Sequence, residues 1–143
     1  MAGKGVKGYF ESARAAIFCL CRGRHPCETG CMFVAWTTTA NRDDADRLAR
    51  GAVEARLAAC AQVDGPIMSY CHWEGRLEQA AEFRVWFKYL PANASALGAW
   101  VHRHHPFATP QWIEVSSEHV GEKYLSWAMA NSTSAPFHSP NQP

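Results

Sequence analysis

Residues 67–89 have the sequence IMSYCHWEGRLEQAAEFRVWFKY, in which two stretches of alternating side chains flank a turn. Alternate residues from Ile67 to Trp73 fall on one side of an extended chain. Glu74-Gly75 then supplies a tight turn, because glycine tolerates the left-handed backbone that such turns require. From Glu82 to Tyr89 a second alternation follows, as in a half-buried antiparallel strand. One side carries Phe83, Val85, Phe87 and Tyr89, and the other carries Glu82, Arg84, Trp86 and Lys88. The stretch therefore predicts two long strands joined as a hairpin.

Further elements are predicted on both sides of the hairpin. An apolar, β-branched run suits a central strand at 32–38, and apolar residues recur at helical spacing after Asn41, a residue type that caps helices. A strand that begins at Cys60 continues into the hairpin, interrupted at 64–66 by residues typical of a turn or bulge.

After the hairpin, Pro91 begins a second predicted helix, which Pro106 ends. The residues Leu97, Trp100, Val101 and His104 share its apolar face. A strand at 111–115 and a short helix around 124–128 complete the pattern. The order strand, helix, strand, strand, helix, strand predicts a ferredoxin-like α+β fold, in which an antiparallel sheet carries both helices on one face.

Composition argues against several classes of function. The 143 residues carry 14 Lys and Arg against 13 Asp and Glu, so the chain lacks the basic surface that nucleic-acid binding requires. No apolar stretch approaches the roughly 20 residues that cross a bilayer, and the run at 15–21 is too short for a secretory signal. We therefore expect a cytoplasmic protein with no nucleic-acid or membrane partner.

The two ends differ in composition from a predicted domain at 31–130. Residues 1–30 are expected to form an extension, and one hypothesis places the natural start at Met32. Four of the six cysteines, Cys19, Cys21, Cys27 and Cys31, crowd the N-terminal segment in the spacing C-x-C-x5-C-x3-C, near His25. Such residues can hold zinc, but the spacing matches no standard zinc knuckle, and reduced thiols are the preferred interpretation. The Ser- and Pro-rich tail 131–143 is predicted to be disordered.

A sheet with both helices on one face leaves its other face open. Trp86 and Trp73 are predicted to lie on the exposed side of the hairpin. Large aromatic side chains on so small a domain form an apolar patch unless a partner covers them. The sequence therefore predicts an oligomer.

Four segments carry a family resemblance, and they are LAACA at 57–61, YCHWEGRLE at 70–78, HHPFATP at 104–110 and YLSW at 124–127. In this order and spacing they resemble the signature segments of the CutA family, over residues 32 to 130. The resemblance implies a ferredoxin-like protomer and a tight homotrimer, similar to the PII signal proteins, in which strands of neighbouring protomers pair edge to edge. It also implies a role in tolerance of copper and other divalent cations.

The resemblance further implies a metal site. The family's proposed ligands are a cysteine near the end of the first strand and the two histidines of the His-His-Pro segment, which match His104 and His105 here. Trp36 occupies the cysteine position and cannot ligate a metal. Gln111 stands where many members of the family have a glutamate, so a charge is missing from the same neighbourhood.

The residues themselves leave alternatives open. Imidazole binds copper and zinc, but adjacent helical residues point about 100° apart, so both histidines bind one ion only if the helix end unwinds or a second protomer contributes. Otherwise His104 packs in the core or at the trimer interface, and His105 caps the helix. Cys60 is a further candidate ligand, although a cysteine in a buried strand usually acts as a small apolar residue.

A second hypothesis is a small-molecule effector site of a PII-like signalling module. Trp73, Glu82 and Lys88 would line a cleft between protomers, where an anionic effector meets Lys88 and stacks on the indole. The structural alternative makes Trp73 an aromatic anchor beside a turn. The absence of a Gly-rich phosphate loop argues against nucleotide, and no nucleophile stands in a catalytic motif, so an enzyme is not predicted. A trimeric scaffold without ligand is a third possibility.

Overall fold

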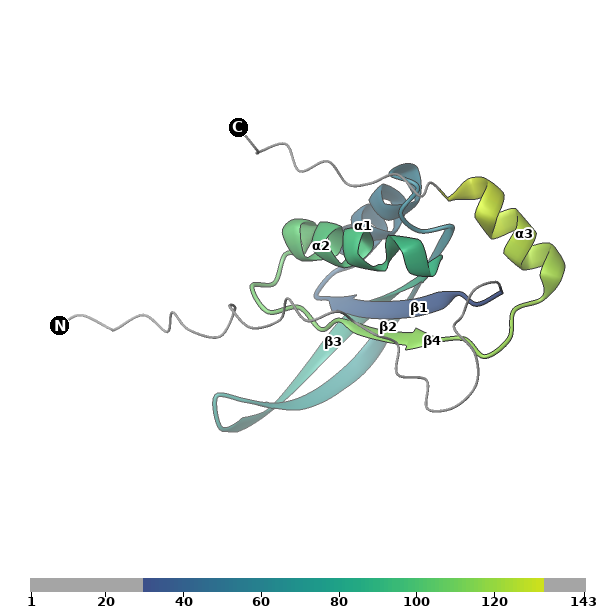
Figure 1. Cartoon of the computed structure of the whole chain (residues 1–143). Coiled ribbons are helices and arrows are strands. Elements are labelled where there is room, and N and C mark those ends of the chain that lie inside the picture. The colour runs from purple at the N-terminus through teal and green to yellow at the C-terminus, as the bar shows by residue number, and fades with distance from the viewer. Residues whose placement is uncertain (1–29, 133–143) are drawn as a thin grey trace, which may run out of the picture.

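The computed structural model describes residues 30–132 (Figure 1). Its elements are β1 (Phe33–Thr39), α1 (Arg42–Glu54), β2 (Cys60–Trp73), β3 (Arg76–Tyr89), the 3-10 turn η1 (Pro91–Asn93), α2 (Ala94–His104), β4 (Ile113–Ser116) and α3 (Glu122–Asn131). The strands form one antiparallel sheet in the order β2-β3-β1-β4. This confirms the predicted ferredoxin-like α+β fold. Most of the predicted extension and tail lies outside the described residues.

The main core lies between the sheet and the helices α1 and α2, which cover one face (Figure 1). In register, Ala35 opposes Phe87 and Thr37 opposes Val85, and all four side chains are buried. Their neighbours in sequence point to the other face, because strand side chains alternate. The two helices approach closely at Gly51, where an added Cβ would lie 2.7 Å from the indole of Trp100.

Local signals place the first helix as predicted. The Asn41 side chain accepts a hydrogen bond from the Asp44 backbone N–H at 2.9 Å, which caps α1. Arg47, one turn later, pairs with the Asp44 carboxylate and also donates to the carbonyl of His104. Arg47 thereby links α1 to the C-terminal end of α2, where a cation is favoured.

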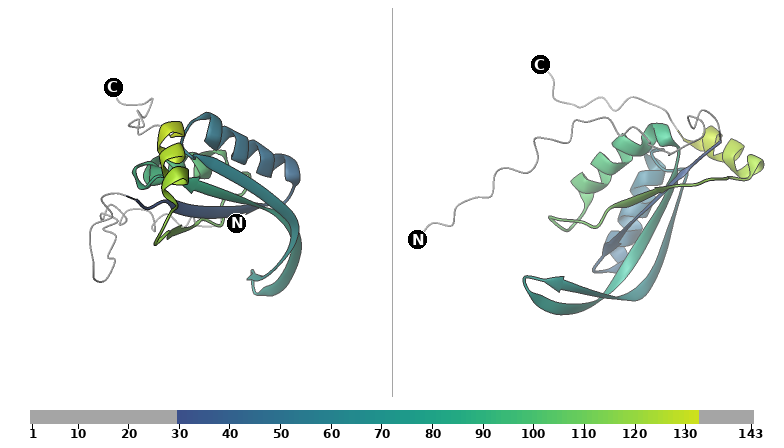
Figure 2. Two further views of the ribbon diagram at one scale, coloured as in Figure 1. Left: turned by 90° about the vertical axis from the view of Figure 1, so that its right-hand side faces the viewer. Right: turned by 60° about the horizontal axis from the view of Figure 1, so that its bottom comes forward.

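The hairpin of β2 and β3 projects beyond the rest of the sheet and curls (Figure 2). A register shift between Asp64 and Ile67 marks the predicted bulge, and Glu74 and Gly75 form the turn with φ angles of 50° and 78°. β1 accompanies β3 only from Tyr89 back to Phe83. Beyond that point the hairpin has no third strand within the described residues.

A few predicted details are wrong. Pro91 begins the 3-10 turn η1 rather than α2, β4 is shifted to Ile113–Ser116, and α3 extends to Asn131. His104, predicted on the apolar face of its helix, is exposed. The helix ends at this residue, and the chain leaves it in an extended conformation at His105, so the helical period does not continue to the core.

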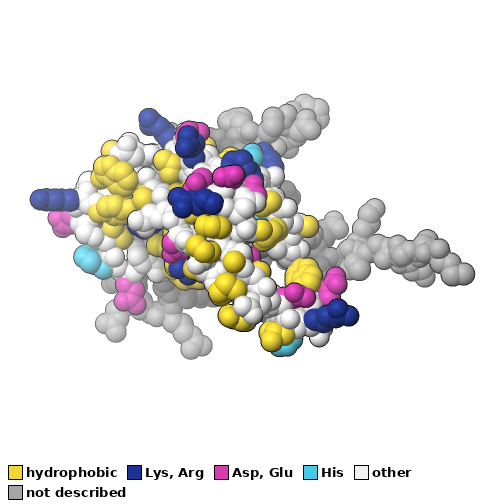
Figure 3. All heavy atoms as spheres, turned by 180° about the vertical axis from the view of Figure 1, so that it is seen from behind, with side chains coloured by type: hydrophobic (Ala, Val, Ile, Leu, Met, Phe, Trp, Pro, Cys, Tyr) yellow, Lys and Arg dark blue, Asp and Glu magenta, His cyan; other side chains and the backbone are white. Residues whose placement is uncertain are grey.

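Besides Val53 on α1, large apolar side chains remain exposed on the hairpin, on β4 and on α3. They are Met68, Tyr70, Trp73 and Leu77 on the hairpin, Ile113 and Val115 on β4, and Tyr124, Trp127 and Met129 on α3. Figure 3 shows apolar side chains in several patches over one side of the molecule, reaching the end of the hairpin at lower right. On the open sheet face, the half-buried rings of Trp36 and Trp86 lie 5.1 Å apart.

A second, smaller core lies under α3, where Ala128 packs with Met32 and Ala59. No helix within residues 30–132 is long and apolar enough to cross a membrane.

Candidate functional site

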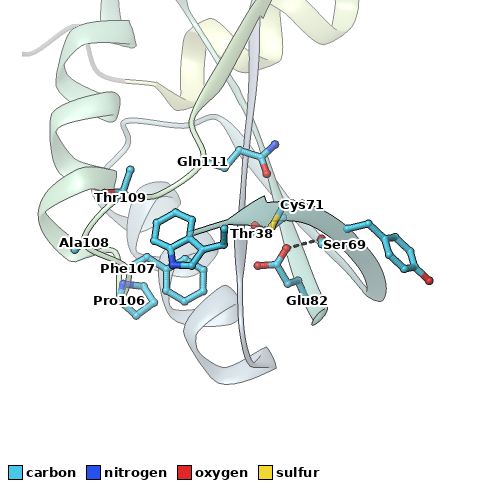
Figure 4. Close-up of a pocket in the computed structure, with 11 residues that line it drawn as sticks. Thr38, Ser69, Cys71, Glu82, Pro106, Phe107, Ala108, Thr109 and Gln111 are labelled. Atoms are coloured by element: carbon cyan, nitrogen blue, oxygen red, sulfur yellow. Dashed lines mark hydrogen bonds between the residues drawn. The ribbon is translucent and has the colours of Figure 1, made fainter. Parts of the chain in front are cut away.

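A hollow of about 760 Å³ lies between the hairpin and the loop that joins α2 to β4. Its lining residues are Thr38 from β1, Ser69, Tyr70, Cys71 and Trp73 from β2, Glu82 from β3, and Pro106, Phe107, Ala108, Thr109 and Gln111 from the loop. Figure 4 shows Ser69, Cys71 and Glu82 together on the hairpin side, and Pro106 and Phe107 on the loop side. Three strands and one loop thus build the site.

Glu82 is the charged residue of this hollow. Its carboxylate oxygen Oε2 accepts a hydrogen bond from the Ser69 hydroxyl at 2.5 Å (Figure 4). Both side chains are half-buried, and the register of β2 and β3 places them on one face of the hairpin. Within the described residues, no ion pair includes Glu82. The carboxylate is therefore oriented without being neutralised.

The structure brings Trp73 and Glu82 into one hollow but leaves Lys88 elsewhere. Lys88 is six residues beyond Glu82 on β3, about 20 Å along the strand. Its ammonium group donates to the side-chain oxygen of Gln62 at 2.8 Å. The predicted effector site therefore loses its cation, although all three residues do share one sheet face.

His105 is buried, with 9% of its surface exposed, and uses both ring nitrogens. Its Nδ1 accepts from the Phe107 backbone N–H at 3.0 Å, so Nε2 carries the proton and donates to the Thr37 hydroxyl at 3.0 Å. Burial lowers the pKa of His105 below its usual value of 6.5, which favours this neutral form. No lone pair remains for a metal ion while both bonds persist.

These two bonds give His105 a structural role at the hollow. They join the residue that follows α2 to a buried hydroxyl of β1 and to the backbone of Phe107, which lines the hollow. His105 therefore holds the start of the loop against the sheet. It is the C-cap residue of α2, as predicted, but the helix-end carbonyl of His104 is satisfied by Arg47.

His104 is arranged differently. Its ring is exposed and stacks on Trp100 with centroids 4.3 Å apart. Nδ1 lies 2.7 Å from the Trp100 carbonyl oxygen, which can only accept, so Nδ1 carries the proton. The lone pair of Nε2 therefore points away from this bond, in the tautomer that a metal ligand requires.

Cys60 lies far from these histidines. It pairs across the sheet with Lys88, which pairs with Val34, three residues before Thr37. Cys60 is therefore two strands away from Thr37, the β1 residue that contacts His105. The separation is about 10 Å along the strands and about 10 Å across them. The thiol instead contacts the Tyr124 hydroxyl on α3, where burial, with a smaller contribution from Cys60, raises the pKa of Tyr124.

No group of three or more His, Cys, Asp or Glu side chains converges as a metal site within residues 30–132. Of the predicted N-terminal ligands, Cys19, Cys21, Cys27 and His25 lie outside the described residues. Cys31 lies within them, is buried and is disulfide-bonded, so the prediction of a reduced thiol is wrong for this residue. Trp36, at the position of the family's cysteine, contacts Trp86, and its indole has no atom that could ligate a metal. One described protomer thus supplies a single histidine ring nitrogen suited to a metal at the His-His-Pro segment.

Sequence reasoning missed the loop side of the hollow. The alternation from Ile67 to Trp73 already grouped Ser69 and Cys71 with Trp73, so the hairpin side was accessible to prediction. Phe107 gave no such signal, because an irregular loop has no period that shows which way its side chains point. Gln111 was predicted to begin a strand, whereas it lies in the loop before β4 and lines the hollow.

Known proteins share this sequence pattern and this fold. Residues 33–131 match the family model of the CutA1 divalent ion tolerance protein. The CutA homolog of Xenopus laevis is 34% identical over 99 residues, covering 69% of this chain and 66% of that protein, just under two thirds of its length. The crystal structure of CutA1 from Oryza sativa superimposes with a TM-score of 0.71 at 27% identity, covering 75% of this chain and 98% of that chain.

A third comparison bears on location. The structure from Archaeoglobus fulgidus has a TM-score of 0.67 at 27% identity, covers 70% of this chain and 97% of that chain, and is described as a periplasmic divalent cation tolerance protein CutA. The cytoplasmic location of the present chain therefore stays a prediction. The match over residues 33–131 includes every described strand and helix. The chain belongs to the CutA1 family of divalent ion tolerance proteins.

Proposed function

We propose that this protein acts in tolerance of divalent cations as a homotrimer that binds copper or another divalent cation through His104. The observation that carries the metal part is the ring of His104, which is exposed and has its Nδ1 proton held by the Trp100 carbonyl. An imidazole fixed by a backbone acceptor in this way presents Nε2 as a ready ligand. Copper and zinc both favour imidazole nitrogen.

The trimer is proposed from the edges and apolar surfaces of the protomer. β2 and β4 are the two edge strands of the described sheet, and each has an unpaired outer side. Exposed apolar side chains accompany both edges, among them Met68, Ile113 and Val115. A ring in which the β2 edge of one protomer meets the β4 edge of the next would cover both edges and these side chains.

The trimer would also complete the metal site. Because a single described protomer offers one suitable imidazole at the His-His-Pro segment, further ligands are proposed to come from a neighbouring protomer. Participation of His105 and Cys60 stays a prediction. His105 would have to give up its bonds to Thr37 and Phe107 before it could ligate.

Calorimetric titration of Cu(II) and Zn(II) into the full-length protein tests the metal assignment. His102→Ala is a matched control, since His102 is also exposed and has its Nδ1 bonded to the Gly98 carbonyl at 2.8 Å. We expect His104→Ala to abolish binding and His102→Ala to preserve it. Equal loss in both variants would indicate adventitious binding to surface histidines and contradict the proposal.

A second candidate function is binding of a small effector in the hollow beside the hairpin. Its volume of about 760 Å³ suits a small molecule, and it combines aromatic walls with an oriented carboxylate. Trp73 and Glu82, two of the three predicted effector residues, line it. A thermal-shift screen with small metabolites, repeated on Glu82→Gln, tests whether ligands act at this site.

A further inference from the structure

We propose that the hollow binds a small organic cation, with an ammonium group held by Glu82 and the apolar part of the ligand against Phe107 and Trp73. The inference rests on the effector-binding function proposed above and names the class of its ligand. The sequence predicted an anionic effector bound by Lys88. The structure places Lys88 away from the hollow, so the proposed ligand is a cation instead.

The charge of the lining carries the proposal. Glu82 is the charged side chain among the described lining residues, which include no Lys, Arg or His. The nearest cation in sequence on this face, Arg84, is paired with Asp64 at 2.8 Å and lies over the ring of Trp86. An anion entering the hollow would therefore meet uncompensated negative charge, whereas a cation would gain a partner.

The geometry of Glu82 supports recognition of an ammonium group. Ser69 occupies Oε2, and no residue of the described chain donates a hydrogen bond to Oε1. Oε1 is thus left to accept from a ligand N–H, in a charge-assisted bond that is stronger than one between neutral groups. The hydroxyl of Thr109 and the amide of Gln111, also in the lining, offer further acceptors to a multivalent donor such as R–NH₃⁺.

Size and apolar surface favour an organic cation over a bare metal ion. The volume of about 760 Å³ is that of a small-molecule site. Cys71 and Glu82 are the two metal-binding side-chain types in the lining, and no group of three converges anywhere in the described chain. Phe107 and Trp73 instead provide aromatic surface, which attracts organic cations and covers their apolar part.

Three probes of similar shape differ in charge, so they separate the effect of ligand charge from that of ligand shape. They are phenethylammonium, a cation, 2-phenylethanol, which is neutral, and phenylacetate, an anion. Each is titrated into the full-length protein by calorimetry, and amide NMR shifts of Ser69, Glu82 and Phe107 locate the binding. We expect the ammonium probe to bind most tightly and phenylacetate most weakly. Glu82→Gln keeps the shape of the side chain and should weaken binding of the ammonium probe at least about tenfold, leaving the alcohol unaffected.

Glu78→Gln is the matched control, since Glu78 is an exposed carboxylate of the same strand that does not line the hollow. It should leave all three affinities unchanged. If phenylacetate binds in the hollow at least as tightly as the ammonium probe, or if Glu82→Gln has no effect, the cation assignment is overturned while effector binding stands. If none of the probes binds there, both the cation assignment and the effector function are overturned. The His104→Ala titration with metal is independent of these outcomes.

Discussion

Replacement of His105 by alanine should destabilise the protein far more than replacement of its neighbour His104. His105 is 9% exposed and holds Thr37, which is fully buried, and the Phe107 backbone N–H. Its removal deletes two hydrogen bonds, worth about 1 kcal/mol each, and leaves a buried hydroxyl unpaired, which costs about 1–3 kcal/mol where no water replaces the partner. Together these terms predict a loss of about 2 kcal/mol in the free energy of unfolding where a water replaces the partner, and of up to about 5 kcal/mol where none does.

His104→Ala removes an exposed ring that stacks on Trp100 and bonds one helix carbonyl. Such a stacking contact contributes about 0.5–1.5 kcal/mol, and alanine recovers part of it through its higher helix propensity. We therefore expect a loss below about 1 kcal/mol. Denaturant unfolding of both variants at one fixed protein concentration makes the comparison, since assembly makes stability depend on concentration.

His105 also predicts a pH dependence. Burial is the main cause that lowers its pKa, with His102 and Arg47 adding to the effect, while a hydrogen bond to the Thr38 backbone and, to a smaller extent, Asp44 oppose it. In the unfolded chain the imidazole takes up a proton as the pH falls below about 6.5, before the folded protein does. The contribution of the neutral ring to stability is thus complete above that pH and is lost as the pH falls towards the lowered pKa of the folded state.

His105→Asn is the control for this titration, because its side-chain oxygen can still accept from the Phe107 N–H but does not titrate. We expect the variant to keep part of the stability and to lose this pH dependence. Equal losses of stability in His104→Ala and His105→Ala would contradict the structural role of His105. So would a parallel loss of stability in wild type and His105→Asn as the pH falls.

Four further substitutions test other contacts. Gly98→Ala should stabilise the protein by about 0.5–1 kcal/mol, since the new Cβ would meet Trp112 at an ordinary contact distance of 3.6 Å. Gly51→Ala should be less stable than Gly98→Ala by about 1 kcal/mol or more, because its Cβ would lie 2.7 Å from Trp100. Equal thermal unfolding temperatures of the two variants would contradict this. Asp64→Asn removes the exposed partner of Arg84 and should cost less than about 1 kcal/mol near neutral pH. Arg84 lowers the pKa of Asp64, so the difference between wild type and Asp64→Asn should vanish as the pH falls below 3.8, and a constant difference in acid unfolding curves would count against the pair. Leu77→Lys replaces a side chain of the hairpin that is 67% exposed, so the circular dichroism spectrum should not change. The variant should assemble more weakly in analytical ultracentrifugation, because it places a charge on an apolar surface. An unchanged mass at every protein concentration would exclude this side chain from the interface.

Much of the fold was predictable because its signals are local and periodic. Alternation on both sides of Glu74-Gly75 predicted the hairpin, and Asn41 predicted the start of α1, since a capping side chain acts within one turn. The grouping of Trp73 with Glu82 also followed, because residues that share a strand face stay together once the turn sets the register.

The errors fall where a period ends. The helical pattern was extended to His104, yet the helix ends there and the extended backbone at His105 turns that residue inward instead. Lys88 shares a face with Glu82, but it is six residues further along an extended strand, about 20 Å away, and the prediction did not take this distance into account. The loop from Pro106 to Gln111 reaches the hollow through a tertiary contact of His105 with β1, which no local pattern contains.

Native mass spectrometry of the full-length protein titrated with Cu(II) reports assembly and bound metal in a single spectrum, and so tests the homotrimer and its His104 metal site together. The proposed function predicts a homotrimer that takes up copper, with the copper lost and the trimer retained in His104→Ala. A copper-free trimer, a monomer, or copper retained by His104→Ala would contradict it.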